Sequence, residues 1–331
     1  MPSLPKPRLR RTGRINGPVV PAQEPERLHV EELELNGLRW INIERPRTTD
    51  RSWLQDRFDF HPLAYEDIFS RNQRAKIDEY DDHLFAILHF PRFDAESGRL
   101  GSAELDVFVG PGYLITIPND PIDPLSYLFE RCRQSEEVRA DLFSRGPGYL
   151  LYRVTDACVD AGFPMLRKIG AKLEHLEEEI FAGRSSEAVR DISNAKQEII
   201  NFRKVVRPQR VVFRDFERSR HPLLADELEV YFDDLEDASE RIWQMLEGYK
   251  ETVEALEATN ESVLSHSLND VLRVLTVLTV IFLPPTLVAG IMGMNTHVPG
   301  QGTMAGFLGA MGVVLILLVG ALTFFKSRRW L

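Results

Sequence analysis

The pattern of apolar and charged positions is most distinctive near the end of the chain. After Arg273, residues 274–292 carry no charged side chain, and a second uncharged run covers 303–325. At about 1.5 Å per residue, each run is long enough to cross a hydrocarbon core of about 30 Å as a helix. A short loop, 293–302, joins the runs, and a basic segment, 326–331, follows them. The pattern predicts a hairpin of two transmembrane helices in a lipid bilayer.

Residues 28–135 show a different pattern, with short apolar runs between turn residues. Alternation and β-branched or aromatic residues predict strands at four places. These places are 38–43, 83–90, 105–109 and 113–117. The segment His61–Phe69 between the first two is typical of a short helix. We expect a compact α/β domain here.

Residues 136–222 have apolar positions at helical spacing. They recur every three or four residues from Leu166 to Ile180, beside a run of glutamates that favours a solvated helix face. A second helix is predicted from Ala188 to about Val206, ending near Pro208. The two predict a helical hairpin.

From about residue 223 the chain has the composition of a helix, interrupted only by Gly248 before Pro284. If it continues into the first span, 223–292 form a stalk on the order of 100 Å long. Helices of this length usually pack against copies of themselves. An apolar seam for such packing is formed by Leu246, Tyr249, Val253 and Leu256. We therefore expect a homo-oligomer.

Composition and charge narrow the class of protein. The chain has 331 residues, is 44% hydrophobic and carries a net charge of −10, which argues against a nucleic-acid binder. Cys132 and Cys158 fit no metal-ligand spacing and give no reason to expect a disulfide. Residues 1–27 are rich in proline and basic side chains without an apolar signal segment, so we predict a disordered basic tail.

Basic residues near the spans predict the orientation. Lys326, Arg328 and Arg329 follow the second span and Arg273 begins the first, whereas the loop 293–302 contains no Lys or Arg. By the positive-inside rule, both termini lie in the cytoplasm. This predicts a multi-pass protein of the cell (inner) membrane.

These features resemble the CorA magnesium transporters, the two-span class with a GxN signature. The resemblance begins with Gly293-Met294-Asn295 after the first span and with the basic end that closes in Trp330-Leu331. It extends over nearly the whole chain through HPLAYEDI, QRAKIDEYDDHLFAILHFPRFD and VLTVLTVIFLPPTLVAGI. It implies an α+β cytoplasmic domain, a very long stalk helix and a two-helix transmembrane hairpin in a funnel-shaped homopentamer. It also implies a channel for Mg²⁺ uptake and no enzyme activity.

The resemblance assigns roles to residues of the first span. Gly293, Met294 and Asn295 match the selectivity filter, where amide oxygens bind the water shell of an ion that dehydrates reluctantly. The positions that match the pore lining, including an apolar gate of leucines, are Asn269, Leu272, Leu275, Leu283, Thr286 and Gly290. The leucines are equally suited to contact lipid or another helix.

Regulation is implied by a second set of acids. Asp94 and Asp234, with Asp237 close by, fall where the family binds intracellular Mg²⁺ between neighbouring subunits. Carboxylate oxygens are the ligands that this cation prefers. The alternative is that these acids are ordinary exposed side chains.

Several residues depart from the family pattern. Met292 stands where CorA members commonly have Tyr, and Pro285 adds a second proline to the kink in the span. The loop 293–302 has no acid and contains His297, which makes it more similar to the ZntB zinc branch. Retention of Asp94 and Asp234 favours magnesium, and Zn²⁺ transport is the alternative.

Two other classes of protein are alternatives to a transporter. A membrane-anchored scaffold would explain the hairpin and the stalk, but not the polar Asn269 and Asn295 at the two ends of the span. A membrane-bound hydrolase would need a nucleophile or a metal set. The candidates for such a set, which lack paired helical spacing, are His61, Asp67, His83 and His89.

Overall fold

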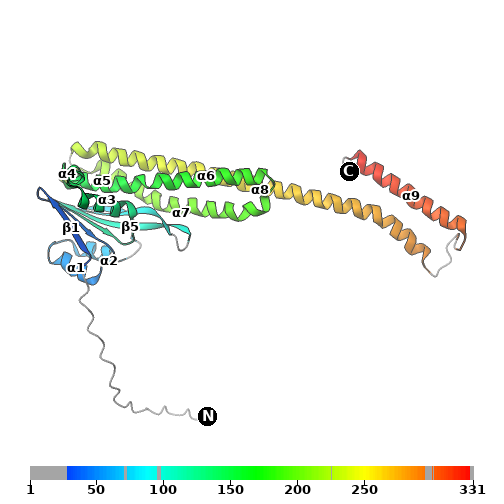
Figure 1. Cartoon of the computed structure of the whole chain (residues 1–331), viewed down its shortest axis with the longest axis horizontal. Helices are drawn as coiled ribbons and strands as arrows, with labels where there is room; N and C mark the ends of the chain where they lie inside the picture. Colours follow the sequence, from blue (N-terminus) through cyan, green and yellow to red (C-terminus); the bar gives the residue numbers. More distant parts are fainter. Residues whose placement is uncertain are drawn as a thin grey trace, which may run out of the picture.

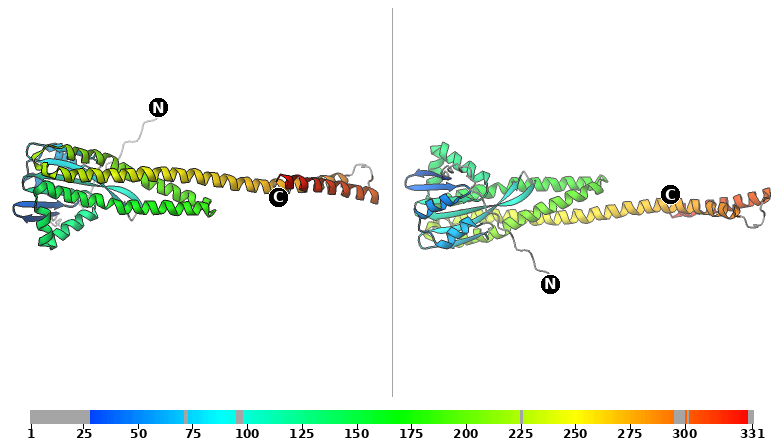
Figure 2. Two further views of the ribbon diagram at one scale, coloured as in Figure 1. Left: turned by 90° about the horizontal axis from the view of Figure 1, so that it is seen from above. Right: turned by 90° about the horizontal axis from the view of Figure 1, so that it is seen from below.

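The computed structural model describes residues 28–70, 73–94, 98–224, 226–294, 300 and 302–328. A domain of sheet and helices occupies one end of the molecule, and α8 (Glu229–Met292) extends from it as one rod (Figure 1). Along the far part of this rod, α9 (Met304–Ser327) folds back, as both further views also show (Figure 2). The tail predicted for residues 1–27 and the Trp330-Leu331 end lie outside the described residues.

Within the described residues, the domain contains a sheet of six strands in the order β1-β2-β6-β5-β4-β3. Strands β2 and β6 are parallel and the other neighbours antiparallel. The strand bounds are β1 Val30–Leu35, β2 Leu38–Ile43, β3 Lys76–Glu79, β4 Leu84–Asp94, β5 Arg99–Gly110 and β6 Tyr113–Pro118. All four predicted strands are confirmed, whereas sequence reasoning missed the edge strands β1 and β3.

Successive side chains of a strand point to opposite sides of the sheet, and here both sides are buried under helices. On one face, Ile41, Phe85 and Phe108 pack with α1 (Thr48–Gln55) and α2 (Pro62–Phe69). The other face, including Trp40 and Leu105, belongs to a larger core with the remaining helices of the domain. These are α3 Asp123–Gln134, α4 Glu136–Phe143, α5 Gly146–Asp160, α6 Gly162–Phe181 and α7 Ser185–Arg218.

The prediction that the second helix of the hairpin ends near Pro208 is wrong. Helix α7 continues through Pro208 to Arg218. Proline removes one hydrogen bond and crowds the preceding turn. Here the loss is offset by tertiary packing, because Val206 before the proline and Phe213 after it are both buried in the core.

The stalk begins later than predicted, since short 3₁₀ turns occupy Pro222–Leu224 and Asp226–Leu228 before α8 starts at Glu229. Helices α7 and α8 pack side by side in opposite directions (Figure 1). Ion pairs join them at four places along their length, and these are Arg214–Glu236, Arg210–Glu240, Arg203–Glu247 and Lys196–Glu257. Each partly exposed pair contributes at most about 1 kcal/mol. Together they tie α8 to the domain at several levels.

Gly148 lets α5 approach the segment that precedes α8. A Cβ atom at this position would lie 2.1 Å from the carbonyl oxygen of Leu223 and 2.7 Å from Leu228 Cδ1. We therefore expect Gly148→Ala to destabilise the domain by about 1–3 kcal/mol through overpacking. Thermal unfolding of the full-length protein in detergent, followed by circular dichroism, measures this.

Gly248→Ala is the matched control, because a Cβ at Gly248 of α8 meets nothing within 4 Å. It is expected to stabilise the protein by about 0.5–1 kcal/mol through the better helix propensity of alanine. Equal unfolding temperatures for the two variants would contradict the close approach at Gly148.

Candidate ion pathway and acidic site

Two described helices are long and apolar enough to cross a membrane. The apolar window of α8 has a mean hydropathy of 2.2 with 6% of it buried, and that of α9 has 2.5 with 0% buried. In a single chain the large side chains of these segments are therefore exposed, including Leu275 at 58% and Leu283 at 64%. An isolated copy in water would leave this surface uncovered.

The contact with α9 distinguishes two sides of α8. Val277 of α8 and Phe325 of α9 are buried in this region, and Ile281, Pro284 and Val288 are half-buried on the same side of α8. At 100° per residue, the predicted pore-lining positions fall within an arc of about 120° on the opposite side. All six are exposed, and they are Asn269, Leu272, Leu275, Leu283, Thr286 and Gly290.

Two threonines that the sequence analysis passed over lie on the same side as these positions. Thr276 Oγ1 donates to the carbonyl oxygen of Leu272 at 2.7 Å, and Thr279 Oγ1 donates to that of Leu275 at 2.8 Å. Thr286 repeats this bond to Phe282 at 2.7 Å. Each hydroxyl keeps its acceptor lone pairs for another donor. The sequence could have indicated these threonines, because the spacings of three residues from Thr276 to Thr279 and seven from Thr279 to Thr286 put all three on one side of a helix.

Gly293 ends α8, and its N–H donates to the carbonyl oxygen of Ala289 at 2.9 Å. Its φ of −85° is open to any residue, so the end of the helix does not use the conformational freedom of glycine. A Cβ there would lie 3.2 Å from that same oxygen, which is a close approach. Asn295 and His297 lie outside the described residues.

A single chain keeps Asp94 and Asp234 apart. Asp94 ends β4, where Phe93 and Ile169 of α6 line one groove. The residue after Ile169 contacts Tyr249 of α8, and Tyr249 lies fifteen residues beyond Asp234. At 1.5 Å per residue this separates the two levels by about 22 Å along α8. A site containing both acids therefore requires a second copy of the chain.

Asp234 instead has acidic neighbours on α5. Tyr152 Oη donates to Asp234 Oδ2 at 3.4 Å, and Asp156 and Asp160 lie about one and two turns further along α5. Burial, and then repulsion from Asp160 and Asp234, raises the pKa of Asp156 to about 6. The nearby Arg153 pairs with Asp141 at 2.8 Å and does not neutralise the group. Sequence reasoning missed these two acids, although their spacing of four residues puts them on one helix face.

The acidic group makes stability depend on pH. Because the pKa of Asp156 is raised above its usual 3.8, its contribution to stability is full below about pH 3.8 and is lost as pH rises through about 6. In metal-free buffer we expect the melting temperature to fall over this window. Asp156→Asn should flatten this part of the profile, which circular dichroism melts at several pH values can check. Asp215→Asn, an exposed acid on α7, is the control and should leave the slope unchanged.

The histidines considered for a hydrolase serve separate roles. His61 Nδ1 accepts from the N–H of Leu63 at the start of α2, whereas His83 stacks on Tyr80 with ring centroids 4.5 Å apart. His89 Nε2 lies 3.5 Å from Glu104. Asp67 pairs with Lys76 at 2.8 Å. Among the described residues, no three or more His, Cys, Asp or Glu side chains are grouped to hold a metal ion.

Comparison with known proteins agrees with this geometry. A family model described as CorA-like Mg2+ transporter protein matches residues 36–329. The chain belongs to this family, which places it among transporters and not among enzymes.

Three relatives illustrate the range of similarity. The cobalt/magnesium transport protein CorA of Thermotoga maritima is 30% identical over 88% of this chain and 83% of its own length. The zinc transport protein ZntB of Yersinia enterocolitica is 22% identical over 88% of each chain. The structure of the CorA magnesium transporter from Methanocaldococcus jannaschii superposes with a TM-score of 0.78 at 22% identity, covering 91% of this chain and 94% of that one. The predicted fold class, an α+β domain with a long helix and two apolar C-terminal helices, is confirmed.

Proposed function

We propose that this protein is a homopentameric channel that takes up Mg²⁺ across the cell (inner) membrane, with both termini in the cytoplasm. The observation that carries the proposal is the continuity of α8, which runs without a break from the acidic site to the filter motif at Gly293-Met294-Asn295. One helix can therefore transmit a change in the domain to the pore.

The two sides of α8 support a pore at the centre of an oligomer. If α9 faces lipid, the opposite side of α8 faces other copies, and this side carries the leucines and threonines described above. Leucine side chains from several copies would form an apolar constriction that closes when water leaves it. Threonine hydroxyls on the same side, between and beyond the leucines, would accept hydrogen bonds from the water shell of a passing ion.

Magnesium is favoured over zinc as the transported ion. Oxygen ligands suit Mg²⁺, and the described side of α8 offers hydroxyls and an amide without thiol or imidazole groups. The relative at 30% identity is named for cobalt and magnesium, whereas the zinc relative is 22% identical. The acid-free loop with His297 supports the alternative, a Zn²⁺ transporter.

Intracellular Mg²⁺ is proposed as the closing signal, bound between copies by Asp94 and Asp234 with Asp237 nearby. The repulsion among Asp156, Asp160 and Asp234 supports this, because a divalent cation would neutralise negative charges that repel one another. Depletion of the ion would restore the repulsion and release α8.

Flux into proteoliposomes tests the proposal, with ion-sensitive dyes for Mg²⁺ and Zn²⁺ in parallel. Mg²⁺ entry that slows as internal Mg²⁺ rises is the expected result. Zn²⁺ entry without Mg²⁺ entry would move the protein to the zinc alternative. Absence of flux for both ions in correctly assembled protein would contradict the proposed Mg²⁺ channel and its Zn²⁺ alternative.

A further inference from the structure

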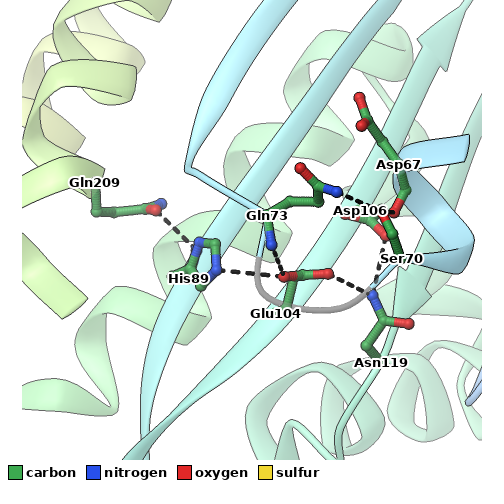
Figure 3. A network of polar contacts seen from close by, with 8 residues as sticks. All are labelled: Asp67, Ser70, Gln73, His89, Glu104, Asp106, Asn119 and Gln209. Atoms are coloured by element: carbon green, nitrogen blue, oxygen red, sulfur yellow. Dashed lines mark hydrogen bonds and ion pairs between the residues drawn. The ribbon is translucent and has the colours of Figure 1, made fainter. Parts of the chain in front are cut away.

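A buried polar network connects the sheet to α7, away from the ion pathway (Figure 3). Glu104 and Asp106 point to the same side of β5 and are 6% and 0% exposed. One amide group bridges them, because Asn119 Nδ2 donates to Glu104 Oε1 at 2.8 Å and to Asp106 Oδ2 at 3.1 Å. Two carboxyl groups therefore share one amide nitrogen in the interior, each accepting one of its two N–H donors.

The network reaches α7 through His89. Strand β3 pairs with β4 only as far as Ile87, so the edge of β4 is open at His89. Gln209 of α7 covers this edge, since its Oε1 accepts a hydrogen bond from the backbone N–H of His89 at 2.8 Å. On the other side, His89 Nε2 lies 3.5 Å from Glu104 Oε2 (Figure 3). The contact between α7 and the sheet at Gln209 thus depends on His89, which also contacts Glu104.

Glu104 is well supplied with donors and Asp106 is not. Besides Asn119 and His89, Glu104 accepts from the N–H of Gln73 at 3.0 Å. In the part of the chain that the structure describes, Asp106 Oδ1 is buried without a hydrogen-bond partner. Both Asp106 and the neighbouring Asp67 would be negative if ionised, and Lys76 is engaged by Asp67 at 2.8 Å and Asp78 at 2.6 Å. Among the described residues, no cation forms an ion pair with Asp106, so a second negative charge here would add to that of Glu104.

Other charged groups border a neighbouring cavity of about 430 Å³. Arg74 and Lys204 line this cavity from the segment before β3 and from α7, and Asp120 lines it while pairing with Arg92 at 3.5 Å. Within the described residues, neither Arg74 nor Lys204 forms an ion pair with Glu104 or Asp106. The cavity therefore gives water a route to the network, and the two described cations that line it leave both carboxyl groups without an ion pair.

Burial, followed by the charge of Glu104, raises the pKa of Asp106 well above its usual range. Two adjacent carboxyl groups in an interior cannot both ionise without a large cost, so they release their protons in separate steps. The charge of the pair therefore changes at a pH far above that of an ordinary carboxyl group.

We propose that Asp106 holds a proton at neutral pH, and that losing it as pH rises loosens the joint of Glu104, His89 and Gln209 that seats α7 on the sheet. An ionised Asp106 repels Glu104, since Asn119 already donates to both groups and has no further N–H to offer. Movement of Glu104 then disturbs His89, whose N–H holds Gln209. Because ion pairs connect α7 to α8, a change in the position of α7 can shift the position of α8. The pH dependence of the contact between α7 and the sheet rests on the fold alone. An effect of cytoplasmic pH on ion flux rests in addition on the proposed function.

Two measurements on the full-length protein in detergent test this without flux. The first is the infrared difference spectrum between wild type and Asp106→Asn at pH 7. The C=O stretch of a protonated carboxylic acid should be lost in the variant. If only a carboxylate band is lost, Asp106 is ionised at pH 7 and the proposal fails.

The second measurement is hydrogen exchange of the α7 peptide that contains Gln209, comparing proteins at equal pH so that intrinsic exchange rates cancel. At pH 6 the wild type and Asp106→Asn should agree. Above the pKa, the opening equilibrium of wild type should increase by up to about tenfold per pH unit relative to the variant. Asp120→Asn, a carboxyl group that lines the same cavity, is the control and should follow wild type. Parallel pH profiles for wild type and Asp106→Asn would overturn the proposal.

Discussion

Asn295→Ala is expected to abolish cation uptake into proteoliposomes while the protein still assembles. In the proposed filter, one amide oxygen from each copy binds the water shell of the entering ion. A hydrogen bond to a charged species contributes about 1.5–3 kcal/mol, so even one lost contact lowers ion binding about tenfold to more than a hundredfold. Because the substitution acts in every copy at once, flux should fall to the background of empty liposomes.

Gln301→Ala is the matched control for this variant, since it removes another amide from the same loop. It should transport at close to the wild-type rate. Size-exclusion chromatography with light scattering must show the same assembly for both variants and wild type. Wild-type flux in Asn295→Ala, or an equal loss in Gln301→Ala, would contradict a specific role for Asn295.

Sequence reasoning succeeded where the local pattern and the tertiary environment agree. Strand β4 is continuously apolar over its first five residues and is buried between two layers, so its composition already indicated a strand. The apolar part of α8 could also be predicted from its composition. A single span of this length in a bilayer satisfies its backbone N–H and C=O groups by forming a helix. Its two prolines, Pro284 and Pro285, did not end it.

It failed where local preference and packing disagree. The edge strands β1, VEELEL, and β3, KIDE, carry acids that are poor strand formers, and an edge strand tolerates them because one side faces water. At Pro208 the local rule predicted a helix end, yet burial of residues on both sides kept α7 intact.

The candidate sites divide in a similar way. The face of α8 follows from the helix period, so its members could be selected from the sequence together with the resemblance. The group of Asp156, Asp160 and Asp234 could not, because it depends on how α5 packs against α8. The network around Asp106 is further removed from sequence, since it joins strands, a loop and α7.

Replacing both Asp94 and Asp234 with asparagine is expected to remove the protection that Mg²⁺ gives against proteolysis. A ligand that binds only the closed assembly stabilises it by about 2.7 kcal/mol at a hundred times its dissociation constant. Cleavage of wild type through its opened form should therefore slow about a hundredfold when millimolar Mg²⁺ is added. In the double variant, the ratio of rates with and without Mg²⁺ should fall to about one.

The ratio is the informative quantity, because asparagine also removes repulsion and can change the rate in the absence of metal. Asp233→Asn is the control, since Asp233 is the exposed neighbour of Asp234 but points about 100° away around α8. It should keep the full effect of Mg²⁺. A double variant that Mg²⁺ still protects a hundredfold would exclude Asp94 and Asp234 as the sensor. The acids of α5 would then be the residues to replace next, since they repel one another within a single chain and need no second copy to be close.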